Sequence, residues 1–230
     1  MTRRGCTAVL LAAALVGAAF AQSRVVTLST DDGASLSAAV YEPFDRPSPA
    51  IILLHMLGRS RRDWDDAANR LRNAGFFVLA LDFRWIDPST GGQGFTVLLH
   101  DVRAALEYVK ARPEVIPGRI GIAGASLGAN VAALAAAEDP AVKALALISP
   151  SLDYRGLRAE APLRKYGNRH LLLVAAAGDP YARRSSRELA AGGANRELIV
   201  TETVGHGTML LAREPALVDR LVDWFQRTLL

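Results

Sequence analysis

The predicted fold rests on the stretch Arg119-Ile120-Gly121-Ile122-Ala123-Gly124-Ala125-Ser126-Leu127-Gly128. Its first five residues are typical of a short buried strand, and the alanine-rich run from Leu127 to Glu138 favours a helix. Between them stands a G-x-S-x-G pentapeptide. In this context it predicts a sharp strand-to-helix turn that presents the Ser126 hydroxyl as a nucleophile. The alternative is a chance pattern in a chain rich in Gly, Ala and Ser.

Similar apolar runs alternate with helical patterns along the chain. Strands are expected at residues 50–55, 76–82, 119–123, 144–149, 171–176 and 198–201, and helices at 63–74, 96–111, 127–138, 181–191 and 215–229. Runs of Val, Ile, Leu and Ala without polar alternation are typical of strands buried on both faces. The fold class is therefore predicted as α/β, a mostly parallel sheet with helices on both faces. Residues 25–41, with an Asp-Gly turn, predict a leading antiparallel hairpin.

The first 21 residues are predicted to be a signal peptide, followed by one domain over residues 22–230. Arg3 and Arg4 precede an uncharged stretch from Thr7 to Phe20, and Ala19-Phe20-Ala21 offers a small-x-small cleavage site. The alternative is an uncleaved membrane anchor, but the apolar part is shorter than the roughly twenty residues that span a bilayer, which favours the signal peptide. We therefore expect the protein to be exported to the periplasm or the medium.

Cleavage would remove Cys6, the single cysteine, and would lower the formal charge from +4 to +2 by removing Arg3 and Arg4. No disulfide within the mature protein is then expected. The remaining basic residues are scattered, which does not indicate nucleic-acid binding. The cluster Arg59–Arg62 is expected on a solvated face, or near the site where it could meet an anionic substrate.

A serine nucleophile needs a base and a group that orients the base. Asp179 follows the predicted strand at residues 171–176 and is the candidate acid; the alternative is a helix N-cap, since Pro180 follows it. Asp153 is the reserve acid. His206, between two glycines after the last predicted strand, is the candidate general base.

The other three histidines have different expected roles. His100 lies in a helical pattern and His170 begins a strand at its wrong end, so both are expected to be packing or surface groups. His55 ends the predicted strand at residues 50–55 and opens the loop that follows it.

The order serine, acid, histidine, together with the loop His55-Met56-Leu57-Gly58, resembles the α/β-hydrolase superfamily. Within it the chain is most similar to small lidless members of the dienelactone-hydrolase and carboxylesterase kinds. The resemblance implies that the Leu57 amide joins the Leu127 amide in binding an oxyanion, and that His55 is mainly structural. Met56 replaces a family glycine, and it is expected to line the substrate pocket.

The segment Asp82-Phe83-Arg84-Trp85 resembles the Asp-x-Arg-Gly-His-Gly segment of the same superfamily. Trp85 is expected to help bind substrate, whereas Asp82 and Arg84 are expected mainly to hold the loop. Residues 91–94 are expected to form a flexible connector. The short excursion at residues 151–169 leaves no room for a cap domain.

These residues together predict a serine hydrolase that cleaves a carboxylic ester, lactone or thioester through an acyl-enzyme intermediate. No metal or organic cofactor is implied, and the expected partner is a small-molecule acyl substrate. The alternatives are a non-catalytic binding protein of the same fold and a serine peptidase of the same fold.

Overall fold

The computed structural model describes residues 23–230 except residues 88 and 90, and it leaves out the side chains of residues 91–93. The predicted signal peptide, residues 1–21, lies outside the described residues and stays a prediction. Among the helices of the described part, none has the length and apolar character that a membrane crossing requires.

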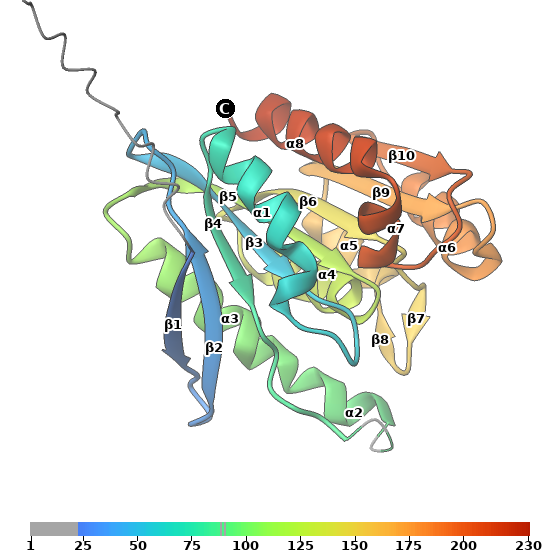
Figure 1. The fold of residues 1–230 in the computed structure, drawn as a ribbon. Coiled ribbons are helices and arrows are strands. Elements are labelled where there is room, and N and C mark those ends of the chain that lie inside the picture. The colour runs from blue at the N-terminus through green and yellow to red at the C-terminus, as the bar shows by residue number, and fades with distance from the viewer. Residues whose placement is uncertain (1–22, 88, 90) are drawn as a thin grey trace, which may run out of the picture.

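An eight-stranded sheet forms the centre of the molecule, in the order β1-β2-β4-β3-β5-β6-β9-β10 (Figure 1). The strands are β1 (Arg24–Ser29), β2 (Ser35–Tyr41), β3 (Ser48–Leu54), β4 (Phe77–Leu81), β5 (Val115–Ala125), β6 (Val142–Ile148), β9 (His170–Ala176) and β10 (Arg196–Thr201). Strands β1 and β2 pair antiparallel, and β2 pairs antiparallel with β4. From β4 to β10 every neighbouring pair is parallel.

Helices cover both faces of this sheet (Figure 1). The helices are α1 (Asp65–Asn73), preceded by the 3-10 helix η1 (Arg61–Trp64), α2 (Gly91–Thr96), α3 (Leu98–Lys110), α4 (Leu127–Glu138), α5 (Glu160–Tyr166), α6 (Pro180–Ala190), α7 (Thr208–Arg213) and α8 (Pro215–Leu229). Buried side chains of α3, α4, α5 and α6 belong to one apolar cluster, and those of α1, α7 and α8 to a second. Alternate residues of β3 join opposite clusters: Ile52 the first, and Ile51 and Leu53 the second. The fold class predicted from the sequence is confirmed.

Most predicted elements coincide with observed ones to within two residues, and α4 and α8 have the predicted bounds. Two expectations were wrong. Residues 91–94, expected to form a flexible connector, belong to helix α2. Strand β5 also begins at Val115, earlier than Arg119, because pairing with β3 continues past the Pro-Gly step to Val115.

The excursion at residues 151–169 is small, as predicted. It contains the two-residue strands β7 (Asp153–Tyr154) and β8 (Leu157–Arg158), and then α5. The fully buried Asn130 of α4 holds it: its Nδ2 donates to the carbonyl oxygens of Ser151 and Leu157, both at 2.8 Å, and its Oδ1 accepts the Ser151 N–H. The excursion is therefore fixed to the body of the domain, and no cap domain forms.

Parallel pairing places the carboxyl ends of β3, β5, β6, β9 and β10 at one edge of the sheet. In open α/β sheets this edge is where ligands bind. The loops that carry Leu57, Ser126, Asp179 and His206 all follow these strands, so the sheet topology brings the sequence candidates to one side of the molecule.

Candidate active site

Ser126 occupies a strained turn between β5 and α4. Its backbone has φ 51° and ψ −114°, a region that residues other than glycine rarely adopt. Its N–H donates to the Ile148 carbonyl at 2.9 Å, and its carbonyl accepts the Ala129 N–H at 2.9 Å. Because these bonds lie on both sides of the residue, the turn is held in the strained state.

The two glycines of the pentapeptide are required by close backbone contacts, as the sequence predicted. A Cβ on Gly124 would clash with the carbonyl of Gly128, and a Cβ on Gly128 would lie 2.5 Å from the carbonyl oxygen of Leu54. Real Cβ atoms do not approach a carbonyl oxygen so closely. Gly128 therefore lets the turn pack against the end of β3, and Gly124 lets the start of α4 pack closely on the end of β5.

Three side chains from different loops form one hydrogen-bonded chain. His206 Nε2 lies 2.8 Å from Ser126 Oγ, and His206 Nδ1 lies 2.6 Å from Asp179 Oδ2. Since an ionised carboxylate only accepts hydrogen bonds, Nδ1 carries the ring proton and Nε2 is free to accept the serine proton. The Ser126 residue is only 8% exposed, whereas the imidazole is 43% exposed and within reach of a ligand. This is the arrangement in which a serine hydroxyl can be activated.

Asp179 makes the contacts expected of both alternatives that the sequence left open. Its Oδ1 accepts the Ala182 N–H at 3.1 Å and so caps α6, in which Pro180 holds the first position. Its other oxygen, Oδ2, accepts from His206. The helix cap fixes the carboxylate, and the fixed carboxylate orients the imidazole.

The loop that carries His206 is held by Met56 and by three residues that the sequence did not single out, Ser149, Asp63 and Thr208. Ser149, fully buried just after β6, accepts the Gly207 N–H on its Oγ at 2.9 Å. Thr208 Oγ1 donates to Asp63 Oδ2 at 2.7 Å. Met56 Sδ packs against Gly207, where a Cβ would come within 2.7 Å of the sulfur. The only signal for Ser149 was its place at the end of a predicted strand, and no local pattern marks Asp63 or Thr208.

A cavity of about 250 Å³ includes Leu127, the residue after Ser126, in its lining, together with Leu57 and Trp85. Ser126, Asp179 and His206 themselves do not line it. Leu127 is the first residue of α4, so its N–H belongs to the group that a helix leaves without an internal partner. Trp85 is 83% exposed. Met56, which was expected to line the pocket, instead contacts the segment at residues 207–208 and is absent from the lining of this cavity.

His55 has a structural role, as the resemblance implied. Its Nδ1 lies 2.8 Å from the Met56 carbonyl oxygen, and its Nε2 lies 3.0 Å from the Phe83 N–H. A carbonyl requires a proton on Nδ1, and an N–H requires a bare Nε2, so these two partners select the neutral ring. Burial also lowers the pKa of His55. The ring thereby joins the loop after β3 to the loop after β4.

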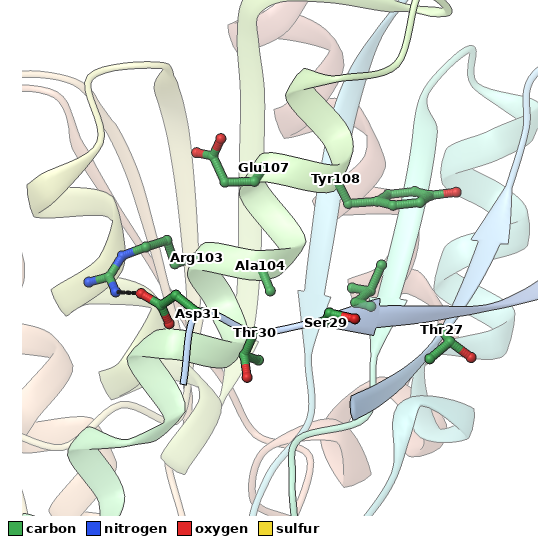
Figure 2. A pocket seen from close by; sticks show the side chains of 9 residues that line it. Thr27, Ser29, Thr30, Asp31, Arg103, Ala104, Glu107 and Tyr108 are labelled. Carbon is green, nitrogen blue, oxygen red and sulfur yellow. Dashed lines mark hydrogen bonds and ion pairs between the residues drawn. The ribbon is translucent and has the colours of Figure 1, made fainter. Parts of the chain in front are cut away.

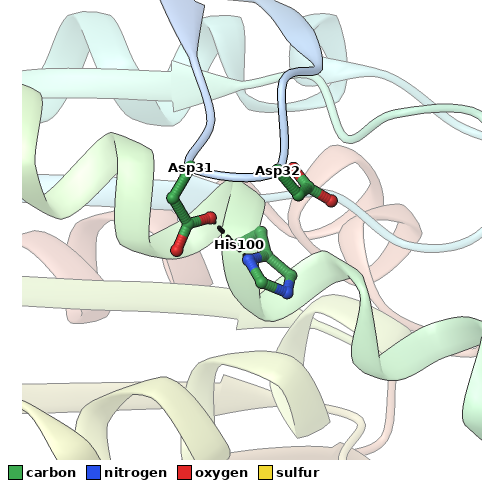
Figure 3. Close-up of side chains that lie close together, drawn as sticks. All are labelled: Asp31, Asp32 and His100. Carbon is green, nitrogen blue, oxygen red and sulfur yellow. Dashed lines mark hydrogen bonds and ion pairs between the residues drawn. The ribbon is translucent and has the colours of Figure 1, made fainter.

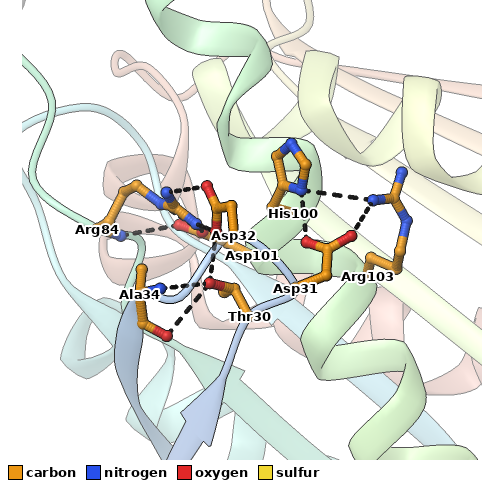
Figure 4. Close-up of polar contacts among 8 residues, drawn as sticks. All are labelled: Thr30, Asp31, Asp32, Ala34, Arg84, His100, Asp101 and Arg103. Atoms are coloured by element: carbon orange, nitrogen blue, oxygen red, sulfur yellow. Dashed lines mark hydrogen bonds and ion pairs between the residues drawn. The ribbon is translucent and has the colours of Figure 1, made fainter.

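The loop after β4 is held by ion pairs. Asp82 pairs with Arg61 and accepts the Arg61 N–H. Arg84 Nε donates to the fully buried Asp101 at 2.6 Å, and its two Nη atoms donate to Asp32 at 2.6 and 2.9 Å (Figure 4). The expectation that Asp82 and Arg84 hold this loop agrees with these contacts.

The reserve acid, Asp153, lies in the β7–β8 hairpin. Its Oδ1 accepts the Gly156 N–H, and its Oδ2 pairs with Arg158. Neither oxygen is bonded to His206, whose Nδ1 partner is Asp179. Asp153 therefore stabilises the hairpin in which it lies.

One group of side chains in the described part has the spacing of metal ligands: Asp31, Asp32 and His100, whose nearest ligand atoms lie within 4.8 Å of one another (Figure 3). Each carboxylate already has a cationic partner, since Asp31 pairs with Arg103 at 2.8 Å and Asp32 with Arg84 (Figure 4). A metal would have to displace these guanidinium groups, so the group is explained by its ion pairs.

A second cavity, of about 450 Å³, lies between β1 and α3 (Figure 2). Side chains such as Thr27, Arg103 and Tyr108 line it. None of its lining residues is Ser126, Asp179 or His206 or a chain neighbour of any of them, so this cavity is separate from the candidate active site.

A family model described as serine aminopeptidase, S33, matches residues 45–166. The match covers more than half of the chain and includes Ser126. The chain belongs to this family. It is a small α/β hydrolase, as the resemblance indicated. The matched region ends before Asp179 and His206. In this S33-family protein, the hydrogen bonds of His206 to Asp179 and to Ser126 connect these two residues to the matched region.

Known proteins similar to this S33-family hydrolase point to the same fold. Two uncharacterized proteins of Mycobacterium tuberculosis, from strains CDC 1551 / Oshkosh and ATCC 25618 / H37Rv, are each 29% identical over 216 residues, which is 85% of this chain and 74% of theirs. The dienelactone hydrolase of Anabaena variabilis ATCC 29413 superposes with a TM-score of 0.77 at 21% identity, over 91% of this chain and 99% of its own. A thermostable carboxylesterase cloned from a metagenomic library superposes with a TM-score of 0.73 at 21% identity, over 94% of this chain and 92% of its own.

The buried neutral His55 predicts a loss of stability in mild acid. Its pKa is lowered in the folded protein, so the unfolded chain binds this proton more readily. The stabilising contribution is complete above about pH 6.5 and is lost as the pH falls toward the lowered pKa. Urea unfolding between pH 7.5 and 5 should therefore show the stability difference between wild type and His55→Gln shrinking as the pH falls. His170→Gln, which removes an exposed imidazole, is the matched control; parallel profiles for wild type and His55→Gln would contradict this account of His55.

Proposed function

We propose that this protein is a serine hydrolase that cleaves a carboxylic ester, lactone or thioester through an acyl-enzyme intermediate. The observation that carries the proposal is the chain of hydrogen bonds from Ser126 Oγ through His206 to Asp179, at 2.8 and 2.6 Å. Such a chain supplies the nucleophile, the base and the orienting carboxylate of acyl transfer. The hydrolase family and the esterase-like fold support the reaction class.

In the proposed reaction, Ser126 Oγ attacks the substrate carbonyl carbon while its proton passes to His206 Nε2. Asp179 stabilises the imidazolium, and His206 then donates the proton to the departing oxygen or sulfur. A water molecule, deprotonated by His206, attacks the acyl-enzyme and releases the acid and free Ser126. The Leu57 and Leu127 amides are proposed to bind the oxyanion, since both residues line the cavity beside Ser126 and Leu127 opens α4.

The family description raises a second candidate, an aminopeptidase. Such an enzyme must bind a free ammonium group, for which a carboxylate is the usual partner. The lining of the cavity beside Leu57 and Leu127 includes no acidic side chain, whereas Arg59 and Arg84 belong to it. This composition favours an ester over a peptide with a free amino terminus.

Substrate preference separates the two candidates. We expect p-nitrophenyl esters of simple acids to be hydrolysed, and the matched aminoacyl p-nitroanilides to be turned over at least tenfold more slowly in kcat/KM. The reason is that the cavity holds no anionic partner for an ammonium group, which would lose hydration without compensation. A preference for the aminoacyl substrates would favour the peptidase instead.

Reaction with a fluorophosphonate probe tests the nucleophile. The wild type should be labelled at Ser126, and Ser126→Ala should lose the label, because the probe reacts only with an activated serine. Ser35→Ala, which removes an exposed hydroxyl at the start of β2, is the matched control and should keep it. Absence of labelling in the wild type would favour the non-catalytic binding protein.

The two contacts of Asp179 allow its roles to be separated. Asn is as good an N-cap as Asp, so Asp179→Asn should preserve α6 and keep the melting temperature close to that of wild type. An amide cannot stabilise the imidazolium or hold its tautomer as a carboxylate does. We therefore expect kcat for a p-nitrophenyl ester to fall roughly 10²- to 10⁴-fold. A variant with wild-type kcat would show that Asp179 only caps the helix.

A further inference from the structure

We propose that the cavity of about 250 Å³ beside Leu57 and Leu127 binds the acyl part of the substrate, and that it selects uncharged apolar acyl groups. This inference rests on the proposed serine hydrolase reaction. It assigns the substrate class of that site.

The direction of proton transfer determines which part of the substrate enters the cavity. The leaving atom must receive its proton from His206 Nε2, so the leaving group lies on the histidine side of the carbonyl. Neither His206 nor Gly207 is among the residues that line the cavity, whereas Leu57 and Leu127 are. The cavity therefore lies away from the leaving-group side, and the group that stays attached to the carbonyl is the substituent that can enter it.

The lining of the cavity is mainly apolar. Six of its residues are Leu57, Phe83, Trp85, Ile86, Leu98 and Leu127. A cavity of about 150 Å³ with such a lining is enough to hold benzene. The present volume of about 250 Å³ accommodates a phenylacetyl or hexanoyl group and leaves unused space around an acetyl group.

The two cations at the cavity already have anionic partners. Arg84 is bonded to both Asp32 and Asp101 (Figure 4), and Arg59 Nε donates to Asp63 Oδ2 at 2.8 Å. A carboxylate in the acyl chain would exchange its hydration shell for apolar walls and for guanidinium groups that are already neutralised. Transfer of a charge to such a site is unfavourable unless it gains a partner, so anionic acyl groups should be poor substrates.

The wall of the cavity is fixed before substrate binds. His55 Nε2 accepts the Phe83 N–H at 3.0 Å, and Asp101 Oδ2 accepts the Arg84 N–H at 2.9 Å. These two bonds hold the backbone directly before Trp85, whose indole is 83% exposed. An acyl group that packs against the indole would remove apolar surface from water at little cost in loop ordering.

Kinetics with p-nitrophenyl acetate, butyrate, hexanoate, phenylacetate and hemisuccinate test the assignment, because the leaving group stays constant. In the wild type kcat/KM should rise from acetate to hexanoate, and the hemisuccinate should fall at least tenfold below the butyrate. In Trp85→Ala the ratio of kcat/KM for hexanoate to that for acetate should drop about three- to tenfold, mainly through KM. Phe44→Ala, which removes a fully exposed aromatic ring on another loop, should leave the ratio unchanged.

A binding measurement checks the same contact without turnover. Of the three tryptophans, Trp64 and Trp224 are buried and Trp85 is exposed, so acrylamide quenching reports on Trp85. In Ser126→Ala, methyl hexanoate should reduce this quenching more strongly than methyl acetate does at the same concentration. Equal protection by the two esters would overturn the assignment.

Other outcomes separate this inference from the proposed function. An unchanged hexanoate-to-acetate ratio in Trp85→Ala, in an enzyme that still reacts with the fluorophosphonate probe, would overturn the acyl cavity and leave the serine hydrolase standing. A preference for the hemisuccinate that Arg59→Gln abolishes would show that the cavity takes anionic acyl groups. Absence of both labelling and ester hydrolysis in the wild type would overturn both proposals.

Discussion

The candidate site depends on two hydrogen bonds at the end of β6. The Ile148 carbonyl accepts the N–H of Ser126, and the hydroxyl of the next residue, Ser149, accepts the N–H of Gly207. Ser149 is itself anchored, since its N–H donates to the Val174 carbonyl of β9 at 2.7 Å. The last residue of a buried central strand and the residue that follows it thus hold the nucleophile turn and the histidine loop. The 2.8 Å contact between Ser126 and His206 is a consequence of this shared anchor.

Around the site, single carboxylates accept hydrogen bonds from two different partners and so hold two parts of the structure together. Asp179 divides its two oxygens between the α6 cap and His206. Asp63 accepts from Thr208 beside the histidine loop and from Arg59 beside the cavity. Loops of this kind are mobile unless they are tied down, and catalysis by oriented groups tolerates little displacement. The hydrogen bonds that hold these loops therefore also keep the side chains of the proposed reaction in position.

Local sequence patterns were sufficient to predict most of the fold. Apolar runs and an alanine-rich helix marked β3, β5, β9 and α4, since burial on both faces leaves a continuous apolar signature. The exceptions have physical causes. Residues 91–96 contain three glycines, which disfavour a helix locally, so the sequence offered no signal for α2. Helix α7 is only six residues long and follows directly on Gly207, and no element was predicted there from the sequence.

The sequence by itself determined the strand-to-helix turn at Ser126, because that turn depends on residues adjacent in the chain. It also determined the order of serine, acid and histidine, which is simply their order along the chain. It left open whether Asp179 caps a helix or faces the histidine, and it assigned Met56 to the pocket. Only the tertiary structure decided that Asp179 does both, that Met56 packs under the histidine loop, and that Ser149 anchors it. Those outcomes depend on the distances between side chains from separate strands, and such distances follow from sheet register and packing, which no local pattern records.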